Sequence, residues 1–487
     1  MTGPLQSPGR TGVRIAGDHY QWLVAWSACL DLLCQDREPN PAVAVGVEVD
    51  GAGNLDDVTV ERAAQPHTYQ QVKYAVDSAT PVGTEWLTAP SASGGPCLLR
   101  KTADAWQLLG GEDGPCDVAI VTNRAPDPDD VLVAGRDART QLLVPRAAEQ
   151  TGASARGKAR AAWASAAGLT EPELVRLLSV LRFDLALDLA RLEQIVSLKM
   201  LAGGLRGDGA AVQAAACWVA PQVRGGRRRL DGQAVDAAVD SLGLRAGRPR
   251  TVLSVATLLP DPMAPRAAHA LDWVDRFDGP DAYSKRRPKA PATWAGLAVD
   301  IAGIPDGLRG ASDILVTGSL RQATAFAVGA SLRMVTGADV AVAQRGVTWS
   351  SGDDYPTPQN LDPAVVDVGA GDEIAVAVQV AAELADDVAT YLRDNDVPVS
   401  RLLILAPLGG HGDRSVPDSP AANALAVAVR NTVRRVAKGA PRVHLFLAAP
   451  MGLALLLGNR WNRIAPTTVY EDLGGTLGYE PAFDVSA

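Results

Sequence analysis

Apolar positions recur along the chain with two different spacings, which predict where helices and strands lie. In residues 17–36, Leu23, Trp26, Leu30 and Leu33 recur at three- and four-residue steps, as on one face of an amphipathic helix. The next predicted elements are strands at 42–49, 55–60 and 68–76, a helix at 98–109 and a buried strand at 116–122. This order predicts a self-contained αβββαβ domain over residues 12–130.

The pattern changes twice further along the chain. Residues 131–245 are mostly helical in character, with long leucine-periodic runs at 169–201, and we expect a helical connector there. From residue 246, predicted strands at 251–256, 313–316, 339–343, 373–380, 401–406 and 443–448 alternate with predicted helices at 265–273, 321–335, 382–393, 421–435 and 451–457. Such alternation, interrupted by a polar loop at 346–362, is typical of parallel α/β layers.

A faint internal repeat divides this last region into halves of about 246–360 and 361–487. Residues 313–329 and 444–458 each read as a strand, a turn of small residues and an apolar helix that ends at glycine. Two related α/β halves would form a cleft at the carboxyl ends of their strands, where open α/β sheets bind ligands.

Composition adds bounds rather than a function. With 487 residues, 47% hydrophobic content and a mean hydropathy of +0.03, the chain is expected to form two to four globular domains. No stretch of about 18 uninterrupted apolar residues occurs, so no membrane span is predicted. The odd count of five cysteines, without a CxxC pair, argues against a disulfide framework and favours a cytoplasmic location.

The net charge of −9 does not indicate a nucleic-acid binder, so any contact with DNA must depend on a local cluster of positive charge. Two basic runs qualify, at 224–229 and 285–289. A solvated loop is the preferred interpretation of each run.

The strongest chemical signal lies in the first predicted domain. Side chains alternate along a strand, so Gln71 and Lys73 share one face, and Asp57 on the preceding strand can lie beside them. A carboxylate and an amide oxygen suit Mg²⁺ or Mn²⁺, and Lys73 would orient water or neutralise developing charge. Asp56 or Glu48 would supply the second acid. The alternative is that Asp56 and Asp57 close a turn while Lys73 is an ordinary exposed strand lysine.

The wider pattern favours the chemical interpretation. Gly17-x-x-Tyr20-Gln21, Glu48, Asp56-Asp57, Gln71-Val-Lys73 and a strand that ends at Thr122-Asn123 together resemble the Mrr-like branch of the PD-(D/E)xK nucleases. The resemblance implies a restriction-endonuclease-like fold with Asp57 as metal ligand, Gln71 at the E/Q position, Lys73 as catalytic lysine and Gln21 as an accessory residue. Gln71 leaves the site one carboxylate short of the usual pattern.

Residues 246–487 resemble the SAVED sensors that are fused to effectors in CBASS antiphage systems, with two Rossmann-like (CARF-like) halves. The resemblance is carried by Val316-Thr-Gly-Ser-Leu-Arg321, by 445–460, which includes Pro450, and by the closing segment 469–483. It implies activation by a cyclic di- or trinucleotide, with a trinucleotide favoured. It also implies self-association on ligand binding and indiscriminate cleavage of double-stranded DNA.

Candidate residues for the ligand pocket are small turns, cations and aromatic rings. Gly318-Ser319 and Gly409-Gly410 follow strands, where backbone amides can approach phosphate. Arg321 is expected in the first turn of the helix that follows Gly318-Ser319. Lys285 and Arg286 would pair with phosphates, while Trp349, Tyr283 and Trp461 would stack on bases. Ordinary packing is the competing interpretation of each ring.

Three other functions compete with a ligand-activated nuclease. The missing acid at Gln71 leaves open a nucleotide sensor with a silent nuclease fold that only grips DNA or a partner. A metabolic enzyme ranks last, because no GxGxxG or P-loop pattern opens a helix after a strand. A histidine-metal nuclease is disfavoured because His67 lacks suitably spaced partners.

Overall fold

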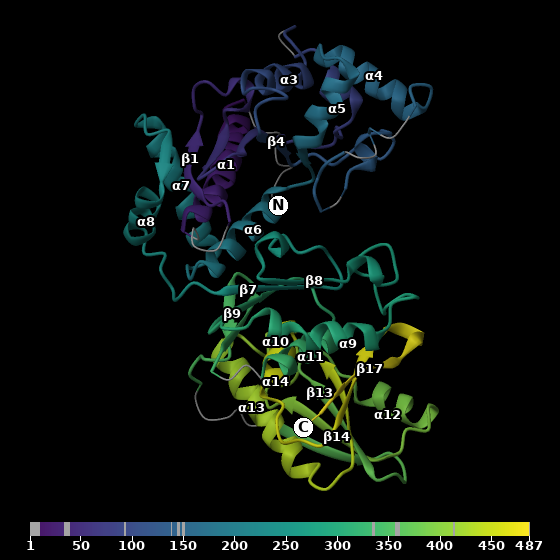
Figure 1. Cartoon of the computed structure of the whole chain (residues 1–487). Coiled ribbons are helices and arrows are strands. Elements are labelled where there is room, and N and C mark those ends of the chain that lie inside the picture. The colour runs from purple at the N-terminus through teal and green to yellow at the C-terminus, as the bar shows by residue number, and fades with distance from the viewer. Residues whose placement is uncertain are drawn as a thin grey trace, which may run out of the picture. The chain divides into compact units, whose positions relative to one another are not determined.

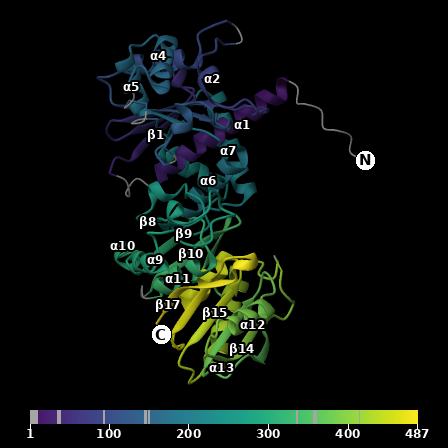
Figure 2. The same cartoon turned by 90° about the vertical axis from the view of Figure 1, so that its right-hand side faces the viewer.

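The computed structural model describes residues 10–33, 39–91, 94–137, 139–143, 147–148, 151–333, 337–355, 361–412 and 414–486. Its internal contacts divide the chain into two compact units, Met1–Gly247 and Arg248–Ala487. Figures 1 and 2 show the elements of each unit in two views. None of the helices in the described part of the chain has the length and apolar character needed to cross a bilayer.

The first unit is built on one mixed sheet. Within the described residues its strands are β1 (Ala42–Val47), β2 (Val58–Arg62), β3 (His67–Lys73), β4 (Cys116–Thr122), β5 (Leu181–Asp184) and β6 (Arg229–Asp231). They form a six-stranded sheet in the order β5-β4-β3-β2-β1-β6. β1, β2 and β3 pair antiparallel, whereas β4 pairs parallel with β3 and β5. The αβββαβ order predicted from the sequence is present.

Helices cover both faces of this sheet. One face packs on α1 (Arg10–Cys29), η1 (Leu30–Leu33), α6 (Leu189–Ala202), α7 (Gly209–Arg224) and α8 (Gly232–Ser241). The other face packs on η3 (Gly53–Leu55), α2 (Thr84–Thr88), α3 (Leu98–Leu108), η4 (Val133–Gly135), α4 (Ala155–Ala167) and α5 (Glu171–Val180). Figure 1 shows α1 and α7 on one side of β4 and α3, α4 and α5 on the other. The alternating inward side chains of the strands supply both cores.

The segment 131–245 differs from the predicted connector, because it completes the first unit. A capping box between Thr170 and Glu173 starts α5. The chain leaves α5 directly into β5, an edge strand of the sheet, so the leucine-periodic run does not form one continuous helix. β6 closes the opposite edge by pairing with β1. Burial of Leu181 and Phe183 in the core on one face of the sheet overrides the helical preference of residues 181–184.

The second unit contains two sheets. The first is ordered β11-β10-β9-β7-β8, from β7 (Thr251–Ala256), β8 (His269–Asp272), β9 (Asp313–Thr317), β10 (Asp339–Gln344) and β11 (Val347–Ser350). The second is ordered β12-β14-β13-β15-β16-β17, from β12 (Leu361–Asp367), β13 (Glu373–Gln379), β14 (Val399–Pro407), β15 (Val443–Ala448), β16 (Thr467–Asp472) and β17 (Tyr479–Val485). Their central strands are parallel, as predicted.

Helices layer the two sheets of this unit. They are η5 (Ala264–Arg266), η6 (Val274–Arg276), α9 (Trp294–Ala302), α10 (Ile304–Gly307), α11 (Gln322–Leu332), α12 (Ala385–Asp394), α13 (Ser419–Val436), α14 (Met451–Arg460) and η7 (Gly475–Leu477). Figure 1 shows α12 and α13 on opposite sides of β13 and β14. The helix predicted at 265–273 is wrong, because that segment forms η5 and β8, which pairs parallel with β7. The loop predicted at 346–362 contains β11 and the start of β12.

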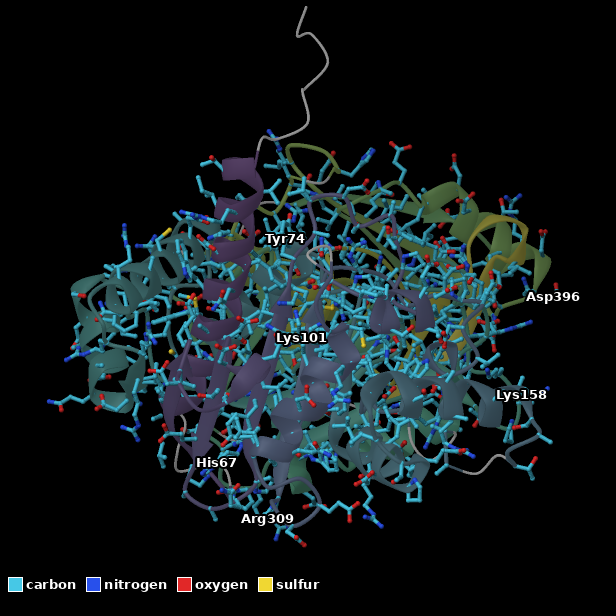
Figure 3. The ribbon with its side chains drawn as sticks, turned by 90° about the horizontal axis from the view of Figure 1, so that it is seen from above. His67, Tyr74, Lys101, Lys158, Arg309 and Asp396 are labelled. Carbon is cyan, nitrogen blue, oxygen red and sulfur yellow. The ribbon has the colours of Figure 1, made fainter. Side chains whose placement is uncertain are left out.

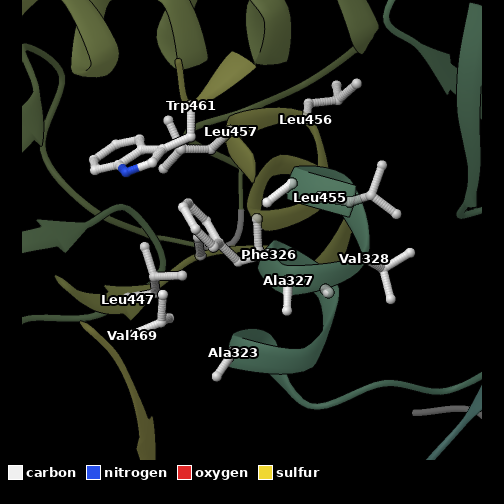
Figure 4. Close-up of a cluster of buried hydrophobic side chains, with 14 of the residues drawn as sticks. Ala323, Phe326, Ala327, Val328, Leu447, Leu455, Leu456, Leu457, Trp461 and Val469 are labelled. Atoms are coloured by element: carbon white, nitrogen blue, oxygen red, sulfur yellow. The ribbon is translucent and has the colours of Figure 1, made fainter. Parts of the chain in front are cut away.

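The internal repeat appears as two equivalent helices in close contact. α11 follows β9 and α14 follows β15, as the repeat predicts. Gly329 and Gly458 lie at the crossing, where a Cβ on Gly329 would come within 2.0 Å of the Leu455 carbonyl oxygen. Phe326 and Trp461 face each other beside it, with ring centroids 5.3 Å apart (Figure 4). The two halves therefore share one apolar core rather than packing as separate bodies.

The first helix has different boundaries from those predicted. α1 begins seven residues earlier than predicted and ends at Cys29, while residues 34–36 of the predicted helix lie outside the described residues. Cys29, Cys97, Cys116 and Cys217 are free thiols. Cys34 lies outside the described residues.

Candidate active site and ligand-binding region

The register of β2 and β3 places Asp57 opposite Gln71. Val58 pairs with Gln70, so Asp57, one residue before β2, faces Gln71 across the ladder. The Gln71 amide Nε2 donates a hydrogen bond to Asp57 Oδ2, and the Val72 backbone N–H donates to the same oxygen at 2.7 Å. The predicted proximity of these side chains is therefore present in the structure.

Asp57 is largely buried, and its ionisation reflects that environment. Burial raises the pKa of the Asp57 carboxyl above its ordinary value. The positive charge of Lys73 and the hydrogen bonds from Val72 and Gln71 oppose the rise, whereas the charge of Asp56 adds to it. Lys73 and Asp56 are therefore close enough to the Asp57 carboxyl to act on it electrostatically.

Lys73 ends β3 beside β4 and is exposed. Asn123 holds the chain that follows it, because Asn123 Nδ2 donates to the Ala75 carbonyl at 2.7 Å and its Oδ1 accepts from the Ala75 N–H at 3.0 Å. The sequence pattern included Asn123, but its positioning of the segment after Lys73 emerges only from the tertiary contacts. Figure 3 shows His67 and Tyr74, which bracket β3, well apart along the strand direction.

The accessory residues meet the site to different extents. Gln21 Nε2 on α1 donates to the Asp57 backbone carbonyl at 3.2 Å, so it supports the backbone rather than the carboxylate. The Glu48 N–H donates to the same carbonyl at 3.3 Å. The Glu48 side chain is exposed and its backbone has a φ of 52°, while Asp56 is partly buried.

The donor set fits a hard cation with few protein ligands. Gln71 is 2% exposed, and its Oε1 is buried without a hydrogen-bond partner among the described residues. An unsatisfied amide oxygen beside a carboxylate matches the preference of Mg²⁺ for oxygen. Among the described residues, however, no three His, Cys, Asp or Glu side chains cluster as a metal centre. Asp57 and Gln71 would therefore hold a cation that keeps several waters.

In the second unit, the turn after β9 is shaped by packing. Gly318 has a φ of +108°, and a Cβ there would lie 1.9 Å from the Val255 carbonyl oxygen, so only glycine fits. The Ser319 carbonyl accepts from the N–H groups of Thr257 and Leu258 at 2.9 and 3.1 Å. Both residues therefore join the turn to β7.

Arg321 is committed to a partner that the sequence did not suggest. Its guanidinium Nη2 lies 2.9 Å from Glu471 Oε1 and also contacts the Asp472 carbonyl. Glu471 Oε2 accepts from the Ala323 N–H in the first turn of α11 at 2.9 Å. Burial raises the pKa of Glu471 to about 7, against the lowering effect of Arg321. An internal carboxylate thus occupies the anion-binding end of α11 where a phosphate was expected.

Two other predicted pocket residues are structural. Lys285 is buried, and its ammonium donates to the carbonyls of Val274 at 2.7 Å and Gly279 at 3.2 Å, so it does not present a free charge to phosphate. Trp349 is also buried and packs against Gly452, which leaves no face for a base. The expected roles of Lys285 and Trp349 in ligand binding are both corrected for the same reason, because each side chain is buried in the protein and cannot reach a ligand.

The remaining predicted pocket residues are accessible. Tyr283 is 90% exposed. Gly409 and Gly410 lie in an open loop after β14, with nothing within 4 Å of a Cβ at either position. Pro450 is the N-cap of α14, a helix start without a side-chain cap of its own. A separate cavity of about 560 Å³ in this unit is lined by Trp273, Asp275, Arg276, residues 289–293, Gly296, Val299 and Asp300, and none of the predicted ligand-binding positions lines it.

Residues 298–485 match the model of the family described as "SAVED: SMODS-associated and fused to various effectors sensor domain". The curated relative CD-NTase-associated protein 4 of Enterobacter hormaechei subsp. hoffmannii (strain UCI 50) is 27% identical over 127 residues. That match covers 25% of this chain and 25% of the relative, so it spans about a quarter of the relative's length.

Two solved structures are similar over most of the chain. The Acinetobacter baumannii Cap4 SAVED/CARF-domain containing receptor with the cyclic trinucleotide 3'3'3'-cAAA is 14% identical, with a TM-score of 0.43 and coverage of 97% of this chain and 99% of that one. The Moraxella osloensis Cap4 SAVED/CARF-domain containing receptor is 14% identical, with a TM-score of 0.40 and coverage of 97% and 99%. Over residues 298–485, the second unit is therefore similar to SAVED sensor domains.

Proposed function

We propose that this protein is a CBASS effector, a metal-dependent endonuclease that degrades double-stranded DNA without sequence preference after a cyclic oligonucleotide binds its SAVED domain. One observation carries the catalytic half of the proposal. The buried Asp57 carboxylate and the unsatisfied Gln71 Oε1 lie together at one end of a sheet, beside Lys73.

The chemistry follows from these groups. A divalent cation bound there would lower the pKa of a water ligand and stabilise charge on the phosphate. Asp57 and Gln71 would hold the cation, and the Val72 N–H fixes the orientation of Asp57. Lys73, exposed at the end of β3, neutralises charge that develops on a scissile phosphate. Val58 and Val72 pack in the core behind the site and keep it rigid.

The match to the SAVED model supports the sensor half. Cap4 receptors of this kind have been solved with the cyclic trinucleotides 3'3'3'-cAAA and 2'3'3'-cAAA. We propose a cyclic trinucleotide as the activating ligand of this chain too, with Tyr283, Gly409, Gly410 and Pro450 as the accessible contact positions. Self-association on ligand binding is part of the same proposal.

The test is a plasmid-degradation assay with the full chain, Mg²⁺ or Mn²⁺, and a panel of cyclic di- and trinucleotides that includes both cAAA isomers. Plasmid should disappear only when a metal and one panel member are both present. Lys73→Ala should abolish cleavage and retain ligand affinity, while Lys158→Ala, an exposed lysine on α4, should behave as the wild type. A fully active Lys73→Ala protein would refute the catalytic assignment.

A second candidate function is favoured by the small number of acids at the site. Because the described residues offer no cluster of three metal-binding side chains there, the first unit would grip DNA without cutting it. In the same assay this function predicts DNA that is shifted on a gel but remains intact with every metal and ligand tested.

A further inference from the structure

Three exposed arginines lie in the loop between α7 and β6. Arg224 ends α7, and Arg227 and Arg228 precede β6. Arg228 makes a long ion pair of 3.4 Å with Asp50, which is almost fully exposed. Within the described residues, Arg224 and Arg227 make no ion pair, and both side chains are exposed to solvent. We call Arg224, Arg227 and Arg228 the basic loop.

The neighbouring Arg229 has a different role. Its guanidinium donates to both carboxylate oxygens of Glu61, at 2.7 Å through Nη2 and 3.0 Å through Nε. Because Glu61 belongs to β2 and β1 lies between β2 and β6, this pair fastens β6 to β2 across β1. The basic run in the sequence therefore divides into the anchor Arg229, Arg228 with its long ion pair to exposed Asp50, and the two free charges of Arg224 and Arg227.

The sheet register brings the basic loop to the catalytic end of the strands. The Val47 N–H donates to the Arg228 carbonyl at 2.8 Å, and the next residue, Glu48, donates to the Asp57 carbonyl at 3.3 Å. Adjacent strands are about 4.8 Å apart, so two spacings place the loop backbone roughly 10 Å from Asp57. This span is comparable to the width of a DNA groove, about 6 Å for the minor and 12 Å for the major.

We propose that the basic loop binds the phosphate backbone of the DNA substrate next to the scissile phosphate; this inference rests on the proposed nuclease function. Guanidinium groups bind phosphate through paired hydrogen bonds and read no base sequence, which suits non-specific cleavage. The chain carries a net charge of −9, so DNA must be held by local positive charge. The nearby acids, Glu48 and Asp50, are exposed, and Asp50 forms the long ion pair with Arg228.

The test measures DNA binding separately from cleavage. Full-length Lys73→Ala protein is titrated against a fluorescein-labelled duplex in Ca²⁺, with and without 3'3'3'-cAAA, over a series of NaCl concentrations. Each phosphate contact contributes about 0.9 to the slope of log affinity against log salt. Arg224→Gln/Arg227→Gln should therefore make this slope shallower by nearly 2. The variant should also bind DNA more weakly at low salt, by the same factor for duplexes of unrelated sequence.

Two matched variants isolate the charge effect. Lys158→Gln removes one exposed positive charge from α4, away from Tyr74 at the catalytic end of β3 (Figure 3), and should leave the slope unchanged. Arg224→Lys/Arg227→Lys should restore it, and circular dichroism establishes that every variant is folded.

An unchanged slope in the double glutamine variant, or equal losses in that variant and Lys158→Gln, would overturn the inference. If the slope falls as expected but the wild type leaves plasmid intact in Mg²⁺ and Mn²⁺, the basic loop stands as a DNA-binding element and only the nuclease function fails.

Discussion

Replacing either glycine at the crossing of α11 and α14 should push the two halves of the second unit apart. A Cβ on Gly329 would lie 2.0 Å from the Leu455 carbonyl oxygen, and one on Gly458 would lie 2.0 Å from the Phe326 carbonyl oxygen. An ordinary contact starts at 3.4 Å, so the helices must move apart by about 1.4 Å. Backbone atoms cannot rotate away, so the whole helix pair has to shift.

The size of the effect follows from two opposing terms. Overpacking a core costs about 1–3 kcal/mol, and a clash with backbone belongs at the upper end. Alanine is favoured over glycine inside a helix by about 1 kcal/mol. The net loss should be roughly 2 kcal/mol for Gly329→Ala and similar for Gly458→Ala. Gly17→Ala is the matched control, because a Cβ at this helical glycine meets nothing within 4 Å.

Urea denaturation of the full chain, followed by circular dichroism, measures these changes, together with affinity for 3'3'3'-cAAA. Gly329→Ala and Gly458→Ala should destabilise the second unit. They should also lower its affinity for 3'3'3'-cAAA, because the N-termini of α11 and α14 move with the helices. Gly17→Ala should instead stabilise the first unit by up to about 1 kcal/mol. If Gly329→Ala were as stable as the wild type or more so, the close packing of the two helices would be refuted.

Three further predictions concern buried charges. Asp57→Asn should abolish Mn²⁺ binding, measured by calorimetry, without lowering the melting temperature; in the wild type, Mn²⁺ affinity should fall with acid at a higher pH than for an ordinary aspartate, because the pKa of Asp57 is raised. The pKa of Glu471 rises from 4.5 to about 7 on folding, so the folded state binds the proton more tightly than the unfolded state. The free energy of unfolding of the second unit should therefore fall by up to roughly 3 kcal/mol as pH rises from 4.5 to 7. In urea denaturation of Glu471→Gln at a series of pH values, this fall in unfolding free energy should be absent. A fall as large as that of the wild type would contradict the assignment to Glu471. Lys285→Met should destabilise the second unit by about 2–4 kcal/mol, because two buried carbonyls lose a charged donor, and a melt within error of the wild type would contradict that structural role.

Local pattern was sufficient for elements whose burial is uniform. Strands such as β4, β7 and β15 occur at the predicted residues because short apolar runs fill central sheet positions. The spacing that places Gln71 and Lys73 on one face of β3 is also local, since side chains alternate along any strand. Asp57 could join them in prediction because its strand is next in the chain and a short connection favours antiparallel pairing.

Contacts between distant segments were decided only in three dimensions. β5 and β6 come from a region with helical periodicity, but they form the two edge strands of the first sheet because they pair with β4 and β1. Arg321 was expected to meet phosphate, but Glu471, 150 residues later, neutralises it. Lys285 and Trp349 have side chains suited to bind a nucleotide, but both are buried and cannot contact one.

The sequence by itself determined the order of elements, the repeat of the second unit and the chemical identity of the candidate catalytic trio, because these depend on neighbours along the chain. The tertiary structure decided which charged groups remain available. Whether an arginine or lysine can reach a ligand depends on the partner that packing brings to it, and that partner is set by sheet register and helix crossing rather than by local sequence. The basic loop illustrates this, since the same run of arginines supplies an anchor at Arg229 and free charges at Arg224 and Arg227.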